Sequence, residues 1–259
     1  YRTAGLFLYT KPLDPRLVAA HRAEVDAFRS GMALSHMPPE VVEIPSSIGP
    51  IPGYFFRAAD DDRPRPTMIL TTGYDGTAEE LYFSSGAAAL ARGWNVCTFD
   101  GPGQGAMLID RGVPIRPDWD VVVTPVVDWL VDRPEVDDDR IVLMGSSLGG
   151  LLAPLAATVE HRLAACISDC GPYDLFTTSI QRLPGFLARE VPDGNPRTLR
   201  LLERILGVVL RKPTAGWALR RNLLVHDLDG PIAFFREARR YSLRGREAEI
   251  RCPTRVCTT

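Results

Sequence analysis

Lysine is almost absent from this 259-residue chain, and so are long apolar runs and a large excess of either charge. Of the 30 basic residues only Lys11 and Lys212 are lysine, a skew more typical of a GC-rich genome than of a recognition surface. The net charge of -2 provides no basic surface for a nucleic-acid backbone. No run of about 18 apolar residues could span a membrane. We therefore expect neither nucleic acid nor a membrane as a partner.

Cysteine is scarce, and its five positions lack the spacing of metal ligands. Most lie in apolar runs such as 94–99, which predicts reduced, buried thiols in a cytoplasmic protein. Three consecutive carboxylates, Asp137 to Asp139, suggest a cation site at first sight. Because Arg140 follows directly and no histidine is adjacent, a solvated loop is the better interpretation. We expect no metal and no cofactor.

The N-terminal residues predict a helical arm. Asp14 and Pro15 form an N-cap followed by proline at the first helical position, and a helix of about 18 residues follows with one apolar stripe. Two short strand-like runs, 41–44 and 53–56, are separated by a Gly/Pro turn and predict an antiparallel pair. We assign residues 1–40 to the arm.

The next segment alternates between strand and helix patterns. Four apolar runs without strict alternation are typical of buried parallel strands, and helical patterns separate them. The runs are 67–71, 94–99, 141–144 and 164–168, and the helices lie near 78–92, 125–133 and 148–159. Thr77 and Glu80 have the spacing of a capping box, so we interpret Glu79 and Glu80 as structural residues rather than as an acid/base pair. In the second helix, near 125–133, Pro125 should occupy the first position. Residues 41–170 therefore predict an α/β core.

A helical stretch interrupts this core. Residues 171–248 contain mainly helical patterns and no convincing strand, so we expect a lid, whereas 253–257 predict one more buried strand and place 249–259 in the core. Apolar side chains of the lid suit a hydrophobic acyl or aromatic group, namely Leu183, Phe186, Leu187 and Trp217.

A serine motif follows the strand at 141–144. Gly145-Ser146-Ser147-Leu148-Gly149 is G-x-S-x-G between a strand and a helix, the context in which a sharp turn exposes the serine hydroxyl. Ser147 is thus the candidate nucleophile. In this architecture the residue after the nucleophile and the loop after the strand at 67–71 donate N–H groups to an oxyanion hole, which assigns Leu148 and Tyr74.

Three segments together carry a family resemblance. Gly73–Glu80, Phe99–Gly105 and Gly145–Gly150 follow one another as in α/β-hydrolases. More narrowly, the chain resembles the branch that contains 2,6-dihydroxypseudooxynicotine hydrolase and fungal hydrolases that shorten polyketide chains in pigment biosynthesis. The helical N-terminus and the run from Val41 to Phe56 also resemble that branch.

The resemblance implies a serine hydrolase with an α/β-hydrolase fold, an N-terminal helical arm and a lid. Members of the branch cleave carbon–carbon bonds next to a ketone, and relatives cleave esters, so we expect a small aromatic or polyketide-like substrate. A carbon leaving group must be protonated, and Asp75 and Tyr173 are candidates to assist; Gly73 is a further candidate for substrate contact. The family also makes a homodimer through the arm plausible.

The family's acid and histidine would follow the strand at 254–258 and a later strand, so we expect both beyond Thr259. The alternative is an internal pair. Asp169 is the best internal acid and His226, in the lid, the best internal base. Of the other histidines, we expect His21 to be packed against the first helix's neighbours, His36 to be solvated, and His161 to lie at the end of a helix.

Two other functions remain open at this point. An acyltransferase or cyclase could use the same serine with another acceptor in place of water. A non-catalytic relative could keep the pocket as a ligand receptor.

Overall fold

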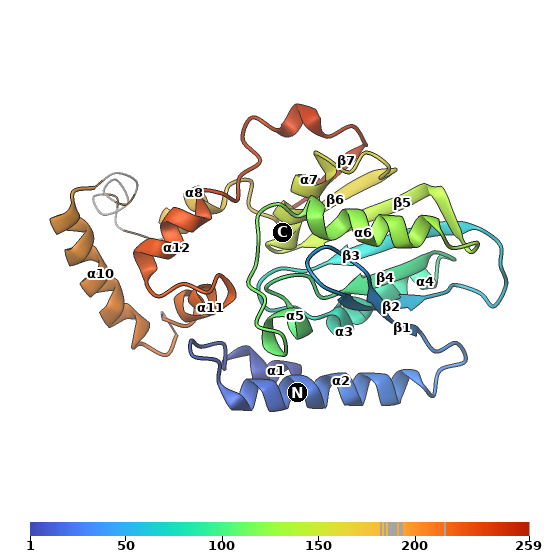
Figure 1. Cartoon of the computed structure of the whole chain (residues 1–259), viewed down its shortest axis with the longest axis horizontal. Coiled ribbons are helices and arrows are strands. Elements are labelled where there is room, and N and C mark those ends of the chain that lie inside the picture. The colour runs from blue at the N-terminus through green and yellow to red at the C-terminus, as the bar shows by residue number, and fades with distance from the viewer. Residues whose placement is uncertain (182, 184, 186–190, 192–193, 215, 259) are drawn as a thin grey trace.

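One mixed sheet forms the centre of the protein (Figure 1). The computed structural model describes residues 1–181, 183, 185, 191, 194–214 and 216–258. Within them the strand order is β1-β2-β4-β3-β5-β6-β7. The strands are β1 Glu40–Ile44, β2 Ile51–Phe56, β3 Arg65–Thr71, β4 Asn95–Phe99, β5 Val136–Ser146, β6 Ala165–Asp169 and β7 Thr254–Cys257. β2 is antiparallel to both β1 and β4, and the remaining pairs are parallel, which confirms the predicted α/β class.

The strands are apolar on both faces because both faces are covered. Ile69 and Cys97 belong to one core cluster, whereas their chain neighbours Leu70 and Val96 belong to the other. Successive strand residues point to opposite faces, so an unbroken apolar run supplies both clusters. This explains why the strands lack an alternating pattern in the sequence.

The helices lie near their predicted positions, with two differences. The helices before the lid are α1 Arg2–Leu6, α2 Pro15–Met32, α3 Ala78–Leu81, the π-helix Tyr82–Gly86, α4 Ala87–Leu90, α5 Gly105–Ile109, α6 Asp120–Val131 and α7 Gly149–Ala157. The single helix predicted at 78–92 is thus interrupted by a π-helical turn. The prediction that Pro125 begins a helix is wrong, because α6 begins five residues earlier, where Trp119, Val122 and Val123 are completely buried. Burial of these side chains outweighs the hydrogen bond that Pro125 cannot donate.

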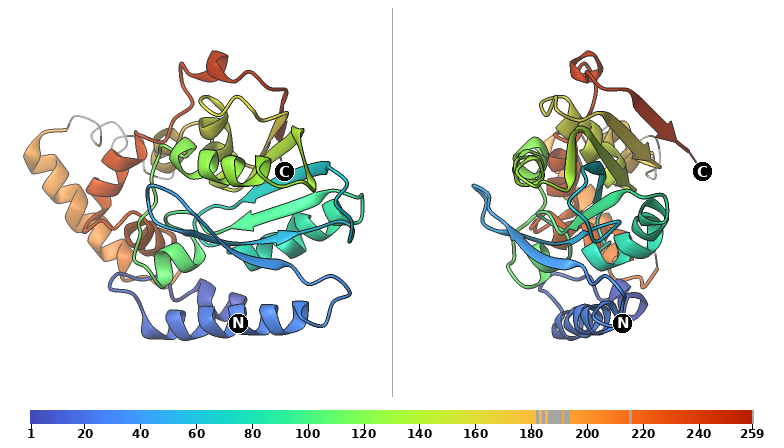
Figure 2. Two further views of the ribbon diagram at one scale, coloured as in Figure 1. Left: turned by 45° about the vertical axis from the view of Figure 1, so that its right-hand side comes forward. Right: turned by 90° about the vertical axis from the view of Figure 1, so that its right-hand side faces the viewer.

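The arm is fixed to the core at the start of α3. Thr77 accepts a hydrogen bond from the Glu80 N–H, as the capping box predicts, but the Glu80 carboxylate pairs with Arg2 at 3.0 Å. Glu79 is buried and accepts a hydrogen bond from the Tyr54 hydroxyl at 2.7 Å. Both carboxylates thus have structural partners, and α2 runs along one side of the core in both views of Figure 2.

The lid helices gather at one end of the sheet, at the left of Figure 1. They are α8 Leu175–Ile180, α10 Pro196–Leu210, α11 Trp217–Val225 and α12 Pro231–Ala238, and the 3-10 helix Glu247–Glu249 follows them. The Trp217 indole donates to the Leu6 carbonyl at 2.9 Å, which joins the lid to the arm. Phe186 and Leu187, named above as lid side chains, lie outside the described residues.

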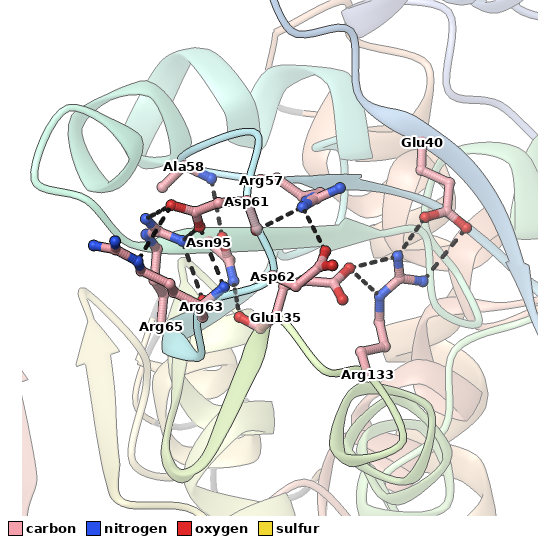
Figure 3. Close-up of polar contacts among 10 residues, drawn as sticks. All are labelled: Glu40, Arg57, Ala58, Asp61, Asp62, Arg63, Arg65, Asn95, Arg133 and Glu135. Atoms are coloured by element: carbon pink, nitrogen blue, oxygen red, sulfur yellow. Dashed lines mark hydrogen bonds and ion pairs between the residues drawn. The ribbon is translucent and has the colours of Figure 1, made fainter.

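A polar network holds together the amino ends of the parallel strands (Figure 3). Asn95 accepts from the Ala58 N–H at 2.9 Å and donates to the Glu135 carbonyl at 2.8 Å. Arg133 bridges Glu40 and Glu135 at 2.6 and 2.8 Å. Because these contacts anchor the starts of β1, β4 and β5, the opposite strand ends are left for a site.

Three local expectations need correction. β7 is the exposed edge of the sheet rather than a buried strand, and Val256 is 67% exposed. Asp137 to Asp139 lie at the start of β5 rather than in a loop, with Asp137 paired to Arg140. Of the five cysteines only Cys97 and Cys166 are buried, whereas Cys170 is exposed. Among the described helices none is both long and apolar enough to cross a membrane.

Candidate active site

Ser147 occupies a sharp turn between β5 and α7. Its φ of 58° lies in the left-handed region, where a serine is strained. The Ser147 N–H donates to the Asp169 carbonyl at 3.0 Å, which ties the turn to β6. The strain is consistent with the predicted nucleophile elbow.

Glycines make this turn sterically possible. A Cβ atom at Gly145 would lie 1.9 Å from the Gly149 carbonyl oxygen, and one at Gly149 would lie 2.5 Å from the Thr72 oxygen. Any side chain at either position would collide with backbone atoms. The two glycines of the motif therefore allow the elbow to fold tightly against β3.

The loop after β3 passes directly over the serine. A Cβ atom at Gly73 would lie 2.8 Å from the Leu148 nitrogen and 3.0 Å from Ser147 Oγ. Among the described residues, no acceptor is hydrogen-bonded to the N–H of Tyr74 or of Leu148. Two unused donors beside a serine hydroxyl fit the geometry of an oxyanion hole.

The tight turn after β4 supports this loop. The Gln104 side-chain amide donates to the Thr72 carbonyl at 2.6 Å. Asp100 is buried and accepts from the N–H groups of Ala78 and Ala106, each at 2.8 Å. Burial raises the pKa of Asp100 well above its usual range. These contacts agree with the structural role that the sequence indicates for residues 100–105.

Ser147 opens into a cavity of about 630 Å³ beneath the lid. Its walls are mainly apolar, and both the elbow and the lid helices contribute. The lining residues are Tyr74, Ser147, Leu148, Cys170, Gly171, Pro172, Leu175, Thr178, Ser179, Leu183, Leu206, Val209, Ala218, Leu219, Arg221, Asn222, Phe234 and Phe235. Of the two members of the predicted apolar lid set that the structure describes, Leu183 lines the cavity, whereas Trp217 stacks against Arg221.

His226 contacts Tyr74, in the loop that follows β3 and would carry the oxyanion hole (the oxyanion loop), rather than the serine. Its Nε2 lies 2.9 Å from the Tyr74 hydroxyl, and the rings of Phe234 and Tyr241 pack around it. Burial lowers the pKa of His226 to about 3 and raises that of Tyr74. Because its Nε2 contacts the Tyr74 hydroxyl and no described contact joins it to Ser147, the geometry does not support a general-base role for His226.

The remaining candidates occupy different places. Asp75 does not line the cavity; its carboxylate lies 3.4 Å from the Arg221 guanidinium. Asp169 holds the elbow through its carbonyl, and its carboxylate accepts from the Cys170 thiol at 3.3 Å rather than from a histidine. Tyr173 is half exposed, with its hydroxyl on Glu247, and lies outside the cavity lining.

None of the other three histidines, all of which the structure describes, lines the cavity. His21 is buried in α2, 3.8 Å from Asp110, while His161 contacts the carbonyls of Thr158 and Glu249. None of the four histidines, all of which the structure describes, is hydrogen-bonded to Ser147.

Sequence reasoning missed Arg221, which lines the cavity from α11. It stands in a run of two arginines, and its neighbour Arg220 instead donates to carbonyls at the end of α10. The local sequence does not distinguish these two arginines.

The comparisons with known proteins agree with this geometry. The alpha/beta hydrolase family matches residues 68–255. The chain is 34% identical to hydrolase acrC of Aspergillus aculeatus and 36% identical to 20-hydroxy-prefusarin hydrolase FUS2 of Gibberella moniliformis. Each match covers 99% of this chain, and 64% and 63% of the relative respectively. The crystal structure of 2,6-dihydroxy-pseudo-oxynicotine hydrolase superimposes with a TM-score of 0.69 at 27% identity, over 90% of this chain and 56% of that one.

The chain therefore belongs to the alpha/beta hydrolase family, and its predicted resemblance to the branch of these relatives is confirmed. It spans less than two thirds of the length of these relatives.

Proposed function

We propose that the protein is a serine hydrolase that cleaves a carbonyl-adjacent bond, carbon–carbon or ester, of a small aromatic or polyketide-like substrate. Ser147 is the nucleophile, and the N–H groups of Tyr74 and Leu148 stabilise the oxyanion that forms when it attacks. The observation that carries the proposal is the strained Ser147 beside Gly73 and two unused N–H donors, at the wall of an apolar cavity. The named relatives supply the substrate class.

The chemistry requires a base that takes the serine proton and an acid that orients the base. His226 contacts Tyr74 and the Asp169 carboxylate contacts Cys170, so neither residue fills these roles in the proposed mechanism. The test is covalent labelling of the full-length protein with a fluorophosphonate, read by intact mass and peptide mapping. We expect one adduct on Ser147, absent in Ser147→Ala and retained in Ser84→Ala, a variant of an exposed serine. A folded protein without an adduct would contradict the proposal.

Product analysis then separates the reactions open to this serine. Aryl 1,3-diketones and aryl esters are incubated with protein whose serine reacts with the fluorophosphonate, with and without an added alcohol. Release in water of an acid and a ketone from the diketone, or of an acid and a phenol from the ester, supports hydrolysis, whereas a new ester that forms only with the alcohol supports acyl transfer.

A ligand receptor is the second candidate. The observation in its favour is that His226 is engaged with the Tyr74 hydroxyl rather than with Ser147. Ligand binding in the cavity without any labelling of Ser147 would support it.

The proposal extends to location and assembly. A cytoplasmic location is supported by the buried thiols of Cys97 and Cys166, and burial raises the pKa of each to about 12.

A homodimer through the arm is supported by the exposed side chains of Phe7 and Leu34. Light scattering on the wild type and on a Phe7→Ser, Leu34→Ser variant tests the dimer.

A further inference from the structure

The N-terminal arm contacts the first residue of the lid helix α11. The Trp217 indole donates to the Leu6 carbonyl at 2.9 Å, and the centre of the Phe7 ring lies 6.0 Å from that of Trp217. An indole has one N–H to donate, so this bond uses the only polar group of the Trp217 side chain. The start of α11 is thereby tied to the end of α1, and the two elements lie side by side in Figure 1.

The same part of the arm holds the other end of α11 by charge. The Lys11 ammonium lies 2.9 Å from the carboxylate of Asp227 and 2.9 Å from that of Asp229, just past the last residue of the helix. The core also pins this end, since the Ile115 N–H donates to the Val225 carbonyl at 2.9 Å. We call residues 6–11 the strap, because they contact α11 at its start and beyond its end.

The strap is itself anchored to the core. Before it, Arg2 pairs with Glu80 at the start of the core helix α3, at 3.0 Å. Within it Tyr9 is buried, and after it Leu17 is buried in the same core cluster. Because the core holds the strap and the strap holds α11, the arm restricts the movement of α11 relative to the core.

α11 in turn fixes the side chain of Tyr74 in the oxyanion loop. His226, which caps the helix, places its Nε2 2.9 Å from the Tyr74 hydroxyl. The Arg221 guanidinium lies 4.8 Å from the centre of the Tyr74 ring and 4.7 Å from that of Trp217. Trp217 therefore contacts both the strap and the arginine that stacks on Tyr74, so a displacement at the start of α11 is transmitted to the oxyanion loop.

We infer that the strap positions the oxyanion loop through α11, and that Trp217 and Lys11 are positioning residues for the reaction at Ser147. The inference rests on the proposed function for the role of the Tyr74 N–H, and it deepens that function by giving the arm a part in it. Neither Trp217 nor Lys11 lines the cavity, so their effect passes through Tyr74 rather than through contact with substrate.

Hydrogen exchange on the full-length protein tests the strap without catalysis. Trp217→Phe keeps an aromatic ring but loses the N–H donor, and Lys11→Met loses both ion pairs. We expect amides in 72–77 and 217–225 to exchange about 2- to 12-fold faster in Trp217→Phe, as the loss of one hydrogen bond allows. The increase should be smaller in Lys11→Met, at most about fivefold, since its two partners are exposed.

Two matched controls lie outside the strap and α11. Trp94→Phe changes a partly buried tryptophan just before β4, and Lys212→Met changes the only other lysine of the chain, which is exposed. Neither control should change the exchange of 72–77.

Labelling with a neutral fluorophosphonate measures the effect on Ser147. In the strap variants the maximal rate constant should fall by less than about tenfold, since the Tyr74 N–H is displaced rather than removed. The probe concentration that gives half the maximal rate should stay unchanged. Lys11→Glu should slow labelling further because it repels both carboxylates, and adding Asp229→Lys, at a side chain that is 98% exposed, should restore much of the rate.

The inference is overturned if exchange of 72–77 is the same in the strap variants as in the controls, or if it increases while folded strap variants are labelled at the wild-type rate. Its failure is distinguishable from that of the proposed function. Labelling of the wild type with no effect of the strap variants leaves the hydrolase proposal standing. A wild type that is not labelled contradicts that proposal, and faster exchange of 72–77 in the strap variants would then still support the strap's hold on the loop.

Discussion

The Tyr74 hydroxyl and His226 Nε2 lie 2.9 Å apart, although 152 residues separate them in the chain. Tyr74 is a proposed oxyanion-hole donor through its N–H, while His226 follows the lid helix α11. The lid thus holds the side chain of this proposed donor. Arg221 stacks on the same tyrosine ring, so two lid residues fix the position of one loop residue.

We expect Tyr74→Phe to destabilise the fold. The variant leaves a ring nitrogen of the buried His226 without its partner, which costs about 1–3 kcal/mol in the free energy of unfolding. Because the backbone N–H remains, labelling of Ser147 should slow by less than about tenfold, well below the loss of a whole oxyanion donor. Urea unfolding and labelling rates measure the two effects. Tyr82→Phe, at a partly buried position, is the matched control. Equal destabilisation of both variants would contradict a stabilising role for the hydrogen bond between Tyr74 and His226.

Gly73→Ala should block the site rather than unfold the protein. Its new methyl group would lie 2.8 Å from the Leu148 nitrogen and 3.0 Å from Ser147 Oγ, which obstructs the position of the developing oxyanion. Since one lost oxyanion donor lowers kcat about 10²- to 10³-fold, we expect labelling and turnover to fall by that order.

The control for this variant is Gly31→Ala in α2, where a Cβ atom meets nothing within 4 Å. Alanine is favoured over glycine inside a helix, so this change should stabilise by about 0.5–1 kcal/mol and leave labelling unchanged. A Gly73→Ala protein that is labelled at the wild-type rate would remove Gly73 from the site.

The parts of the site that depend on local sequence could be predicted. Ser147 and the motif glycines form their turn within five residues, and the order of strand, turn and helix is sufficient to identify it. Tyr74 and Leu148 follow from that architecture, since each takes its place from the end of one strand.

The parts that depend on tertiary packing could not be predicted. Arg221 reaches Tyr74 from a helix 147 residues away, and nothing in the local run distinguishes it from Arg220. Pro125 illustrates a conflict between levels: the local preference for proline at a helix start is overruled by the burial of Trp119. Tyr173 follows β6 closely in sequence, which suggested a place near the serine, yet its hydroxyl donates a hydrogen bond to the Glu247 carboxylate.

Asp100→Asn should weaken the support of the oxyanion loop. The carboxylate accepts one hydrogen bond from the start of α3 and one from the start of α5, through Ala78 and Ala106. An amide can accept only one of them and presents its NH₂ to the other donor, so we expect destabilisation of about 1–3 kcal/mol and slower labelling. Asp62→Asn, whose side chain is 82% exposed, should change neither quantity. Equal melting temperatures for Asp100→Asn and the wild type would exclude this supporting role.

Stability should rise with pH between about 3 and 6.5 because of His226. Burial lowers its pKa from 6.5 to about 3 in the folded protein, so within this window the unfolded chain binds more protons than the folded one. Folding therefore loses up to about 1.4 kcal/mol per pH unit as the pH falls. His21 acts in the same direction, whereas the raised pKa of Asp100 opposes it. Comparing wild type with His226→Gln by urea unfolding at several pH values isolates the His226 contribution: the variant should show a shallower slope below pH 6.5. A slope that does not change would mean that His226 is protonated in the folded protein, and the hydrogen bond to Tyr74 would then need the imidazolium as donor.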